Sequence, residues 1–396
     1  MTAPLQHRIG AIVRRMRYGE ANVVVYGDSI WAQTSTPRCH EGVRNVWRPV
    51  AWKGWAGPVI PSGADIITIV YATGSGKTVT SRAPGDTFYH GGSAISPIQA
   101  GDATWTSNLG AFGTIAEGSI STANLAAFMG GDWAEGRTCT SRFVYWGSAT
   151  TTSNVGSNEY RNNVSVGFVA TVALTQSGGY QNFDRTIDTT TGWPLERVWG
   201  ASPNIDETGS DLALLLFRLW VPSRTGMQFC AISNGGWTAA DHTDTTKCSD
   251  ANHQAFLSAI GTPNVVIIQV GQNLTAGESS AIATTWKTNV ESIINRVRTA
   301  LSNLGETDPL FLLVSQYDTN KGETTHEAMN QALYELARDT SDVAFLNLHR
   351  IAGPFARLDN LYLSDSIHPN AAGANHFARK IWEGAGTTAR RRIRVA

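Results

Sequence analysis

The chain has 396 residues and a formal net charge of −1, and only 16% of its residues are charged. This length exceeds what one hydrophobic core usually serves, so the composition predicts a globular domain with a second lobe. The near-neutral, charge-poor composition argues against a nucleic-acid partner. No stretch approaches the roughly 20 apolar residues of a membrane span, and no apolar signal-peptide core precedes the first strand. We therefore expect a soluble protein, cytoplasmic in the producing cell or released, that has no membrane partner.

The chain opens with a predicted helix and a predicted buried strand. Residues 7–18 repeat apolar side chains at helical spacing. Residues 22–26 (NVVVY) form an unbroken apolar run, which is typical of a strand covered on both faces of a parallel sheet. This strand leads through Gly27 directly into Asp28 and Ser29.

The segment 41–223 has a different character. It is rich in Thr, Ser, Gly and Asn, and its apolar runs are short and separated by turn clusters. Many short strands at this spacing predict an antiparallel β-sandwich of jelly-roll type. We expect this β-rich domain to be inserted into a discontinuous domain formed by residues 1–40 and 224–396.

From residue 224 onward, predicted strands and helices alternate. The strands are 227–232, 264–270, 309–316 and 343–349, and the helices are 250–261, 279–301, 325–339 and 371–384. This alternation predicts right-handed crossovers and a parallel sheet with helices on both faces.

Polar residues and glycines follow the predicted strands, at the edge where doubly wound sheets bind ligands. They are Asp28 and Ser29, Gly235 and Gly236, Asn273 and, near the C-terminal end, Asp365 with His368. Taken singly, each motif also has a structural interpretation as a turn or a helix cap. A nucleophilic serine, however, needs a histidine base, an orienting carboxylate and oxyanion donors. The strand ends supply this whole set, which predicts an acyl-transfer site.

The same motifs, in this order, resemble the successive blocks of the SGNH (GDSL-type) hydrolase superfamily, and among its members the carbohydrate O-acetylesterases. The resemblance covers residues 20–35 and about 224–385. It implies a flavodoxin-like three-layer α/β/α fold, and no cofactor is expected. Two departures are Leu274, where the family often has Asp, and the large β-rich insertion between blocks I and II.

The resemblance implies a role for each residue. Ser29 corresponds to the nucleophile, His368 to the general base, and Asp365 to the carboxylate that orients the imidazole. The oxyanion donors would be the backbone N–H groups of Ser29 and Gly236 and the side chain of Asn273. Gly235 is the alternative to Gly236.

Residues beside these motifs are predicted to contact the substrate. They are Asp28, Trp31, Gly235, Trp237 and Gln272. Nine of the 13 tryptophans lie in the segment 41–223. Most of these should be core residues, and one or two are expected to stack on sugar rings.

Cysteine and histidine spacing gives no metal site. The four cysteines form no CxxC pair, so free thiols are favoured over a pairing of Cys230 with Cys248. A run of possible ligands follows the second block, but its spacing matches no standard metal site: Asp241, His242, Asp244, Cys248, Asp250 and His253. Within that run, Ser249 or Asp250 is expected to cap the next helix.

These observations predict a serine esterase that removes small acyl groups, most simply O-acetyl groups, from a carbohydrate. One alternative is a phage virion protein, associated with a tail or capsid, that binds glycans and keeps a retained or degenerate esterase core. In that case the chain would form a homo-oligomer or a virion assembly. A further alternative is a lipase or thioesterase acting on longer acyl chains.

Overall fold

The structure is a computed structural model of the chain. It describes residues 3–18, 21–31, 39, 227–233, 236–245 and 249–390, and the backbone of ten strands between residues 71 and 220. The chain divides into two compact units, and each is described by itself. The first consists of Met1–Ala51 and Thr225–Ala396, and the second of Trp52–Arg224.

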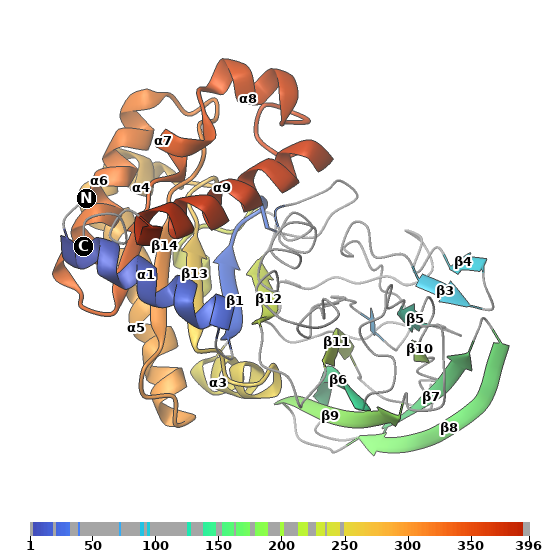
Figure 1. The fold of residues 1–396 in the computed structure, drawn as a ribbon. Helices are drawn as coiled ribbons and strands as arrows, with labels where there is room; N and C mark the ends of the chain where they lie inside the picture. Colours follow the sequence, from blue (N-terminus) through green and yellow to red (C-terminus); the bar gives the residue numbers. More distant parts are fainter. Residues whose placement is uncertain are drawn as a thin grey trace. The chain divides into compact units, whose positions relative to one another are not determined.

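A five-stranded parallel sheet forms the centre of the first unit (Figure 1). In spatial order its strands are β12 (Met227–Ser233), β1 (Ala21–Gly27), β13 (Val265–Gln269), β14 (Leu310–Val314) and β15 (Val343–Leu346). Numbered along the chain, these strands lie in the order 2-1-3-4-5, which is the flavodoxin-like order. The predicted parallel α/β fold is therefore confirmed.

Helices cover both faces of this sheet, which explains why its strands are continuous apolar runs. α1 (Ala3–Tyr18) and α9 (Ala371–Arg390) pack together on one face (Figure 1). α3 (Asp250–Ala259), α5 (Lys287–Asn303) and α6 (Glu323–Asp339) lie on the other. The buried stripe of α5 consists of Val290, Ile293, Ile294, Val297, Ala300 and Leu301. At about 1.5–3 kcal/mol for each large apolar side chain, such stripes supply most of the favourable free energy of this layer.

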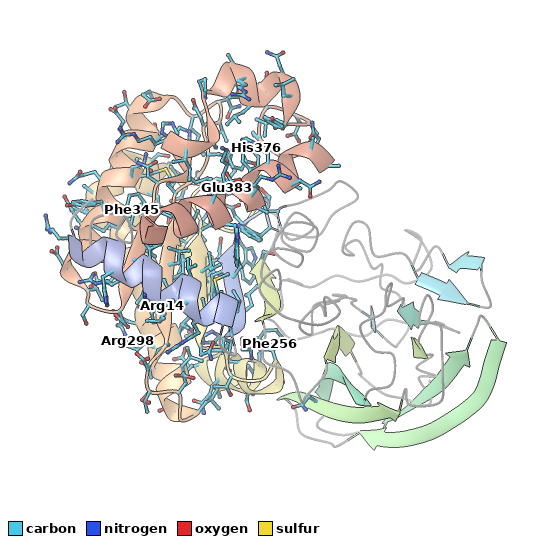
Figure 2. The ribbon with its side chains drawn as sticks, viewed as in Figure 1. Arg14, Phe256, Arg298, Phe345, His376 and Glu383 are labelled. Carbon is cyan, nitrogen blue, oxygen red and sulfur yellow. The ribbon has the colours of Figure 1, made fainter. Side chains whose placement is uncertain are left out.

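Arg298 of α5, labelled in Figure 2, connects this helix to the sheet. Its guanidinium group bonds both carboxylate oxygens of Asp342, at 2.9 to 3.1 Å. The same group lies 5.3 Å from the centre of the Phe311 ring on β14. A long helix is thereby fixed by charge and by packing at the same point.

The predicted helix 279–301 has a different start in the structure. α4 (Ala276–Ser280) precedes it, because Thr275 and Glu278 form a capping box. A π-helical turn, η2 (Ile282–Trp286), then leads into α5.

The predicted strand 343–349 ends earlier, at Leu346. The side chain of Asn347 accepts the N–H of Arg350 and starts α7 (Leu348–Ala352). α8 (Phe355–Leu361), which the sequence did not predict, follows Pro354. Local capping by single side chains thus overrides the apolar pattern at this point.

The second unit contains antiparallel strands. They are β2 (Tyr71–Ala72), β3 (Phe88–His90), β4 (Ser93–Ile95), β5 (Leu125–Ala127), β6 (Thr138–Gly147), β7 (Ser153–Arg161), β8 (Val164–Leu174), β9 (Gly179–Asp188), β10 (Trp199–Ala201) and β11 (Ala213–Trp220). They pair in the orders β2-β11-β6-β9, β10-β5-β3-β4 and β7-β8. Face-to-face packing of these sheets as a sandwich stays a prediction.

Two further expectations concern cysteines and membranes. Cys248 lies outside the described residues, so its pairing with Cys230 stays untested. Among the helices that the structure describes, none combines the length and the apolar character that crossing a membrane requires.

Candidate active site

β1 ends in a tight turn that places Ser29 at the carboxyl edge of the sheet. Gly27 has no room for a side chain, because a Cβ atom there would lie 2.6 Å from the side chain of Trp31. The Asp28 carboxylate accepts the N–H of Ile30 at 3.0 Å. The N–H of Trp31 donates to the Asp28 carbonyl, also at 3.0 Å, and closes the turn. Ser29 lies at its apex with 8% of its surface exposed.

The fold brings His368 and Asp365 to Ser29 across almost the whole length of the chain. The Nε2 atom of His368 lies 2.9 Å from the Oγ atom of Ser29. Its Nδ1 atom lies 2.7 Å from Oδ2 of Asp365. Because a carboxylate only accepts hydrogen bonds, Nδ1 carries the ring proton and Nε2 is left to accept the serine hydroxyl. This chain of hydrogen bonds is the arrangement of a Ser-His-Asp triad.

The loop between α8 and α9 holds Asp365 in its ionised form. Oδ1 of Asp365 accepts the backbone N–H groups of Ile367 and His368, at 3.2 and 2.7 Å. Burial by itself raises the pKa of Asp365, but the hydrogen bonds from His368 and Ile367 outweigh it. The pKa of Asp365 therefore lies below its usual range. Between these residues, Ser366 takes the left-handed backbone conformation (φ 63°) that this compact turn requires.

Tyr317, in the loop after β14, supports this turn from the core. Its hydroxyl donates to the carbonyl of Ile367 at 2.5 Å. Its ring stacks on Phe377 of α9 with the ring centres 3.8 Å apart. The backbone N–H of Ser364 also donates to the carbonyl of His368, at 2.8 Å. The position of His368 is thus fixed from two elements.

Asp28 connects the Ser29 turn to the loops that follow β13 and β14. Its Oδ2 atom accepts three hydrogen bonds, from the N–H groups of Gly271 and Gln272 and from the side chain of Gln316, at 2.8 to 3.1 Å. Gly271 is required here because its φ is +127° and a Cβ atom would meet the side chain of Met329. Burial raises the pKa of Asp28, and its backbone donors oppose this shift.

The groups expected to bind an oxyanion lie around the same strand ends. Residues Gly27, Ser233 and Gln269 stand side by side at the ends of three neighbouring strands, so the loops after them converge. The Nδ2 atom of Asn273 donates to the carbonyl of Trp237 at 3.2 Å, which ties it to the turn at Gly236. Gly236 is exposed and has a φ of +81°. Gly235 lies outside the described residues.

The other residues expected to contact substrate are mostly inside the unit. Asp28 and Trp31 are fully buried, and the indole N–H of Trp31 donates to Gln269 at 2.7 Å. Trp237 and Gln272 are 4% and 5% exposed. The polar atoms of Asp28 are bonded to protein groups, so its position gives it a structural role instead. Aromatic residues beside a catalytic motif can pack under it as readily as line its opening.

In the described part of the run of possible metal ligands after block II, the two histidines are used for packing. Nε2 of His242 lies 2.9 Å from the carbonyl of Gly27, and Nε2 of His253 lies 2.7 Å from the hydroxyl of Tyr26. Both rings are buried. Burial lowers the pKa of His253 to about 3. Ser249 caps α3, as predicted, by accepting the N–H of Asn252.

Sequence reasoning missed Gln316 and Tyr317, two residues that support the site. Both lie directly after the apolar run of β14, where the other site residues were sought. The predicted strand 309–316 extended over Gln316 and so concealed the start of the loop. The polar pair Ser315 and Gln316 directly after Val314 was the available signal that the strand ends at Val314 and that the loop begins there.

A comparison with protein families matches residues 220–375 to the GDSL-like lipase/acylhydrolase family. The match includes Gly236, Asn273, Asp365 and His368, and it begins well after Ser29. The position of Ser29, in the turn after β1, beside His368 is therefore known from the fold, through the 2.9 Å contact. No curated protein matches the chain.

A solved structure shares the fold of this chain, and two further ones match part of it with low scores. A peptidoglycan O-acetylesterase structure is 16% identical over 98% of this chain and 97% of its own, with a TM-score of 0.52. A carbohydrate esterase of family 3 from Talaromyces cellulolyticus is 20% identical over 41% of this chain and 72% of its own, with a TM-score of 0.30. A carbohydrate acetylesterase family member from Sinorhizobium meliloti is 17% identical over 41% and 80%, with a TM-score of 0.31.

Proposed function

We propose that the protein is a serine esterase that removes small acyl groups, most simply O-acetyl groups, from a carbohydrate. The observation that carries this proposal is the pair of contacts at His368. One ring nitrogen lies 2.9 Å from the Ser29 hydroxyl and the other 2.7 Å from the Asp365 carboxylate. A histidine held between a serine and a carboxylate in this way can take the serine proton and return it to a leaving group.

In the proposed mechanism, the Oγ atom of Ser29 attacks the ester carbonyl while Nε2 of His368 takes its proton. Asp365 keeps the ring in the tautomer that can do this, and it stabilises the imidazolium that forms. His368 then protonates the leaving sugar hydroxyl, and an acyl-enzyme remains on Ser29. A water molecule, deprotonated by His368, releases the acid and restores the serine.

The oxyanion of each step would be held by the N–H groups of Ser29 and Gly236 and by Asn273. The hydrogen bond between Asn273 and Trp237 supports this role, because it sets the amide of Asn273 beside the Gly236 turn. Removal of one such donor typically slows turnover by about 10² to 10³-fold.

The choice of a carbohydrate ester rests on two supports. A peptidoglycan O-acetylesterase shares the fold over nearly the whole of both chains. The segment 41–223, where nine of the 13 tryptophans lie, supplies aromatic rings of the kind that stack on sugars. We propose this segment as the substrate-recognition part of the chain.

The test of the esterase is hydrolysis of p-nitrophenyl acetate by the full chain and by Ser29→Ala. We expect turnover to fall to the background rate in the variant, with an unchanged far-UV circular dichroism spectrum. Ser280→Ala, at an exposed serine of α4, is the matched control and should keep full activity. Normal turnover by Ser29→Ala would refute the assignment.

The substrate class is tested separately, with p-nitrophenyl esters of increasing length and with acetylated polysaccharides. We expect activity to fall from acetyl to octanoyl and acetate to be released from polysaccharide. Activity that rises with chain length would instead favour a lipase or thioesterase. Binding of polysaccharide without release of acetate would favour a glycan-binding protein.

A further inference from the structure

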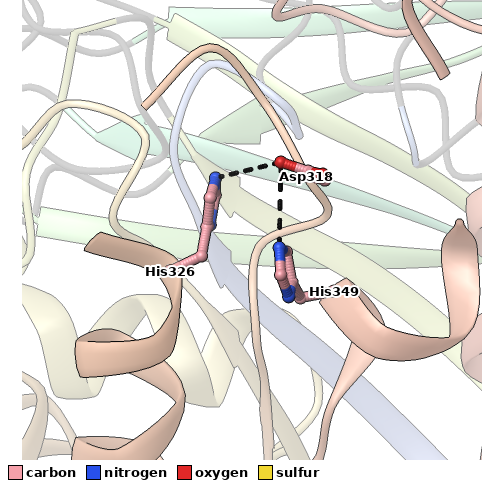
Figure 3. A group of neighbouring side chains, drawn as sticks. All are labelled: Asp318, His326 and His349. Atoms are coloured by element: carbon pink, nitrogen blue, oxygen red, sulfur yellow. Dashed lines mark ion pairs between the residues drawn. The ribbon is translucent and has the colours of Figure 1, made fainter. Parts of the chain in front are cut away.

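A second polar cluster lies at the carboxyl edge of the sheet, and the Ser29 site does not use it. Asp318 lies in the loop after β14, His326 in the first turn of α6, and His349 in α7 after β15 (Figure 3). The side chains of His326 and His349 are 1% and 11% exposed, and that of Asp318 is 15% exposed. Within the part of the chain that the structure describes, this is the one group of metal-ligating side chains that converges.

The distances within the cluster are somewhat longer than those around a bound small cation, so the ligand atoms would have to move together on binding. Oδ1 of Asp318 lies 3.9 Å from Nε2 of His326 and 3.7 Å from Nε2 of His349 (Figure 3). The three ligand atoms all lie within 4.8 Å of one another. In a tetrahedral zinc site, with bonds of about 2.0–2.1 Å, neighbouring ligand atoms are about 3.3–3.5 Å apart. Octahedral magnesium would require about 3 Å between neighbouring ligands.

One buried polar atom of the cluster has no hydrogen-bond partner in the protein. Nε2 of His349 is buried and has no hydrogen-bond partner. Oδ2 of Asp318 accepts the N–H of Phe355 at 2.8 Å, while Oδ1 faces the two imidazoles. A buried nitrogen left without a partner destabilises the fold. A bound cation would remove this cost.

We propose that Asp318, His326 and His349 bind one divalent transition-metal ion, and that this ion is zinc. Two imidazoles and a carboxylate are the ligand set that zinc accepts and that magnesium and calcium do not favour. Glu323, at the start of α6, can supply a fourth ligand. Its Oε2 atom lies 3.5 Å from Nε2 of His349, and its side chain is 63% exposed and so free to approach.

Metal binding requires one local rearrangement. The N–H of Thr319 donates to Nε2 of His326 at 3.2 Å, and the Thr319 hydroxyl lies 3.3 Å from the same atom, so the metal must replace both contacts. The rings of His326 and His349 lie almost parallel, with centres 4.7 Å apart and 19° between their planes, so they must tilt toward one another. Asp318 and His349 need the smaller movement. The free energy of this rearrangement weakens binding, and we expect an affinity in the micromolar range.

The ion would join the loop after β14 to α6 and α7, next to the proposed esterase site. The loop that carries Asp318 also carries Gln316 and Tyr317, which contact Asp28 and the His368 loop. The site therefore has a structural role, because no ligand atom comes from Ser29, His368 or Asp365. This inference does not depend on the esterase reaction.

The experiment is zinc titration of the chelator-treated full chain by calorimetry, with cobalt(II) absorption as the probe of geometry. We expect one zinc per chain, a tetrahedral cobalt spectrum, and a thermal midpoint that rises with zinc and not with magnesium. In His349→Ala and Asp318→Asn the zinc affinity should fall on the order of 100-fold or more.

Two control variants separate this cluster from other histidines. His7→Ala removes an exposed histidine of α1, and His368→Ala removes the one beside Ser29; both should bind zinc as the unmodified chain does. His349→Gln replaces His349→Ala if the alanine variant fails to fold. Loss of zinc binding in His368→Ala but not in the His349 variant would overturn the proposal. So would an unmodified chain that binds no zinc, or that binds magnesium equally well.

Discussion

Replacement of Asp28 by asparagine tests how the Ser29 turn is held. Asp28 is completely buried, and its two oxygens accept four hydrogen bonds from the protein. Asparagine has the same shape but only one acceptor oxygen. When this oxygen faces the three donors at Oδ2, the new NH₂ group faces the N–H of Ile30, and two donors oppose each other.

The magnitude follows from these contacts. A buried N–H without a partner at Ile30 costs about 1–3 kcal/mol. The three bonds at Oδ2 change from charge-assisted to neutral, which loses up to about 1 kcal/mol each. Removal of a buried charge returns part of this, because burial raises the pKa of Asp28 and so disfavours its ionised form. We expect Asp28→Asn to lower the free energy of unfolding by about 2–4 kcal/mol.

Urea denaturation at pH 7, followed by circular dichroism, measures this change. Hydrolysis of p-nitrophenyl acetate should also slow at least tenfold, because Gly271 and Gln272 lead directly into Asn273. Asp308→Asn is the control: Asp308 is 74% exposed and pairs with Arg15, so its loss should change stability by less than about 1 kcal/mol. A change below about 1 kcal/mol in Asp28→Asn, with normal turnover, would show that the Asp28 bonds do not hold the site.

Three further predictions concern other parts of the unit. Asn273→Ala should lower kcat by about 10² to 10³-fold at nearly constant stability, in steady-state kinetics; a loss below threefold would exclude it as an oxyanion donor. Tyr317→Phe removes the hydrogen bond to the carbonyl of Ile367. It should lower kcat with KM unchanged, and it should lower the free energy of unfolding in urea by about 1 kcal/mol. An unchanged kcat together with an unchanged free energy of unfolding would contradict the positioning role of Tyr317. His253 has a pKa of about 3 in the folded chain, below its ordinary value of 6.5. As the pH falls below about 6.5, His253 binds a proton in the unfolded chain but not in the folded one, so the folded chain loses stability. Between pH 7 and pH 4 this loss amounts to about 3 kcal/mol, and in His253→Gln the unfolding free energy should vary correspondingly less with pH over that range.

The sequence predicted the sheet well because buried parallel strands leave an unmistakable pattern. NVVVY and NVVIIQV have no polar face, and only a strand covered on both sides explains this. The ends of elements were predicted less well. Asn347, Thr275 and Pro354 start helices through local hydrogen bonds or backbone restriction, and such effects are weaker in the sequence than an apolar repeat.

The expected substrate contacts show the limit of motif-based reasoning. Trp31 and Asp28 stand beside the nucleophile in the sequence, yet their side chains point into the core. A turn reverses the direction of neighbouring side chains, so adjacency along the chain does not give adjacency in space. Only the bonds to Gln269 and Gln316 show what these two residues do.

The sequence by itself determined the parallel α/β class, the strand that precedes Ser29 and the order of the motifs, because these depend on local patterns of burial. The tertiary structure decided which side chains meet. Ser29 and His368 stand 339 positions apart in the sequence. The register of β1 between β12 and β13 places Ser29, and the hydrogen bond from Tyr317 holds the turn that carries His368. Together these contacts bring the two side chains within hydrogen-bonding distance. Asp318, His326 and His349 were equally visible as residues. Their convergence became apparent only in the folded chain, because no spacing along the sequence encodes where one loop and two helices come together.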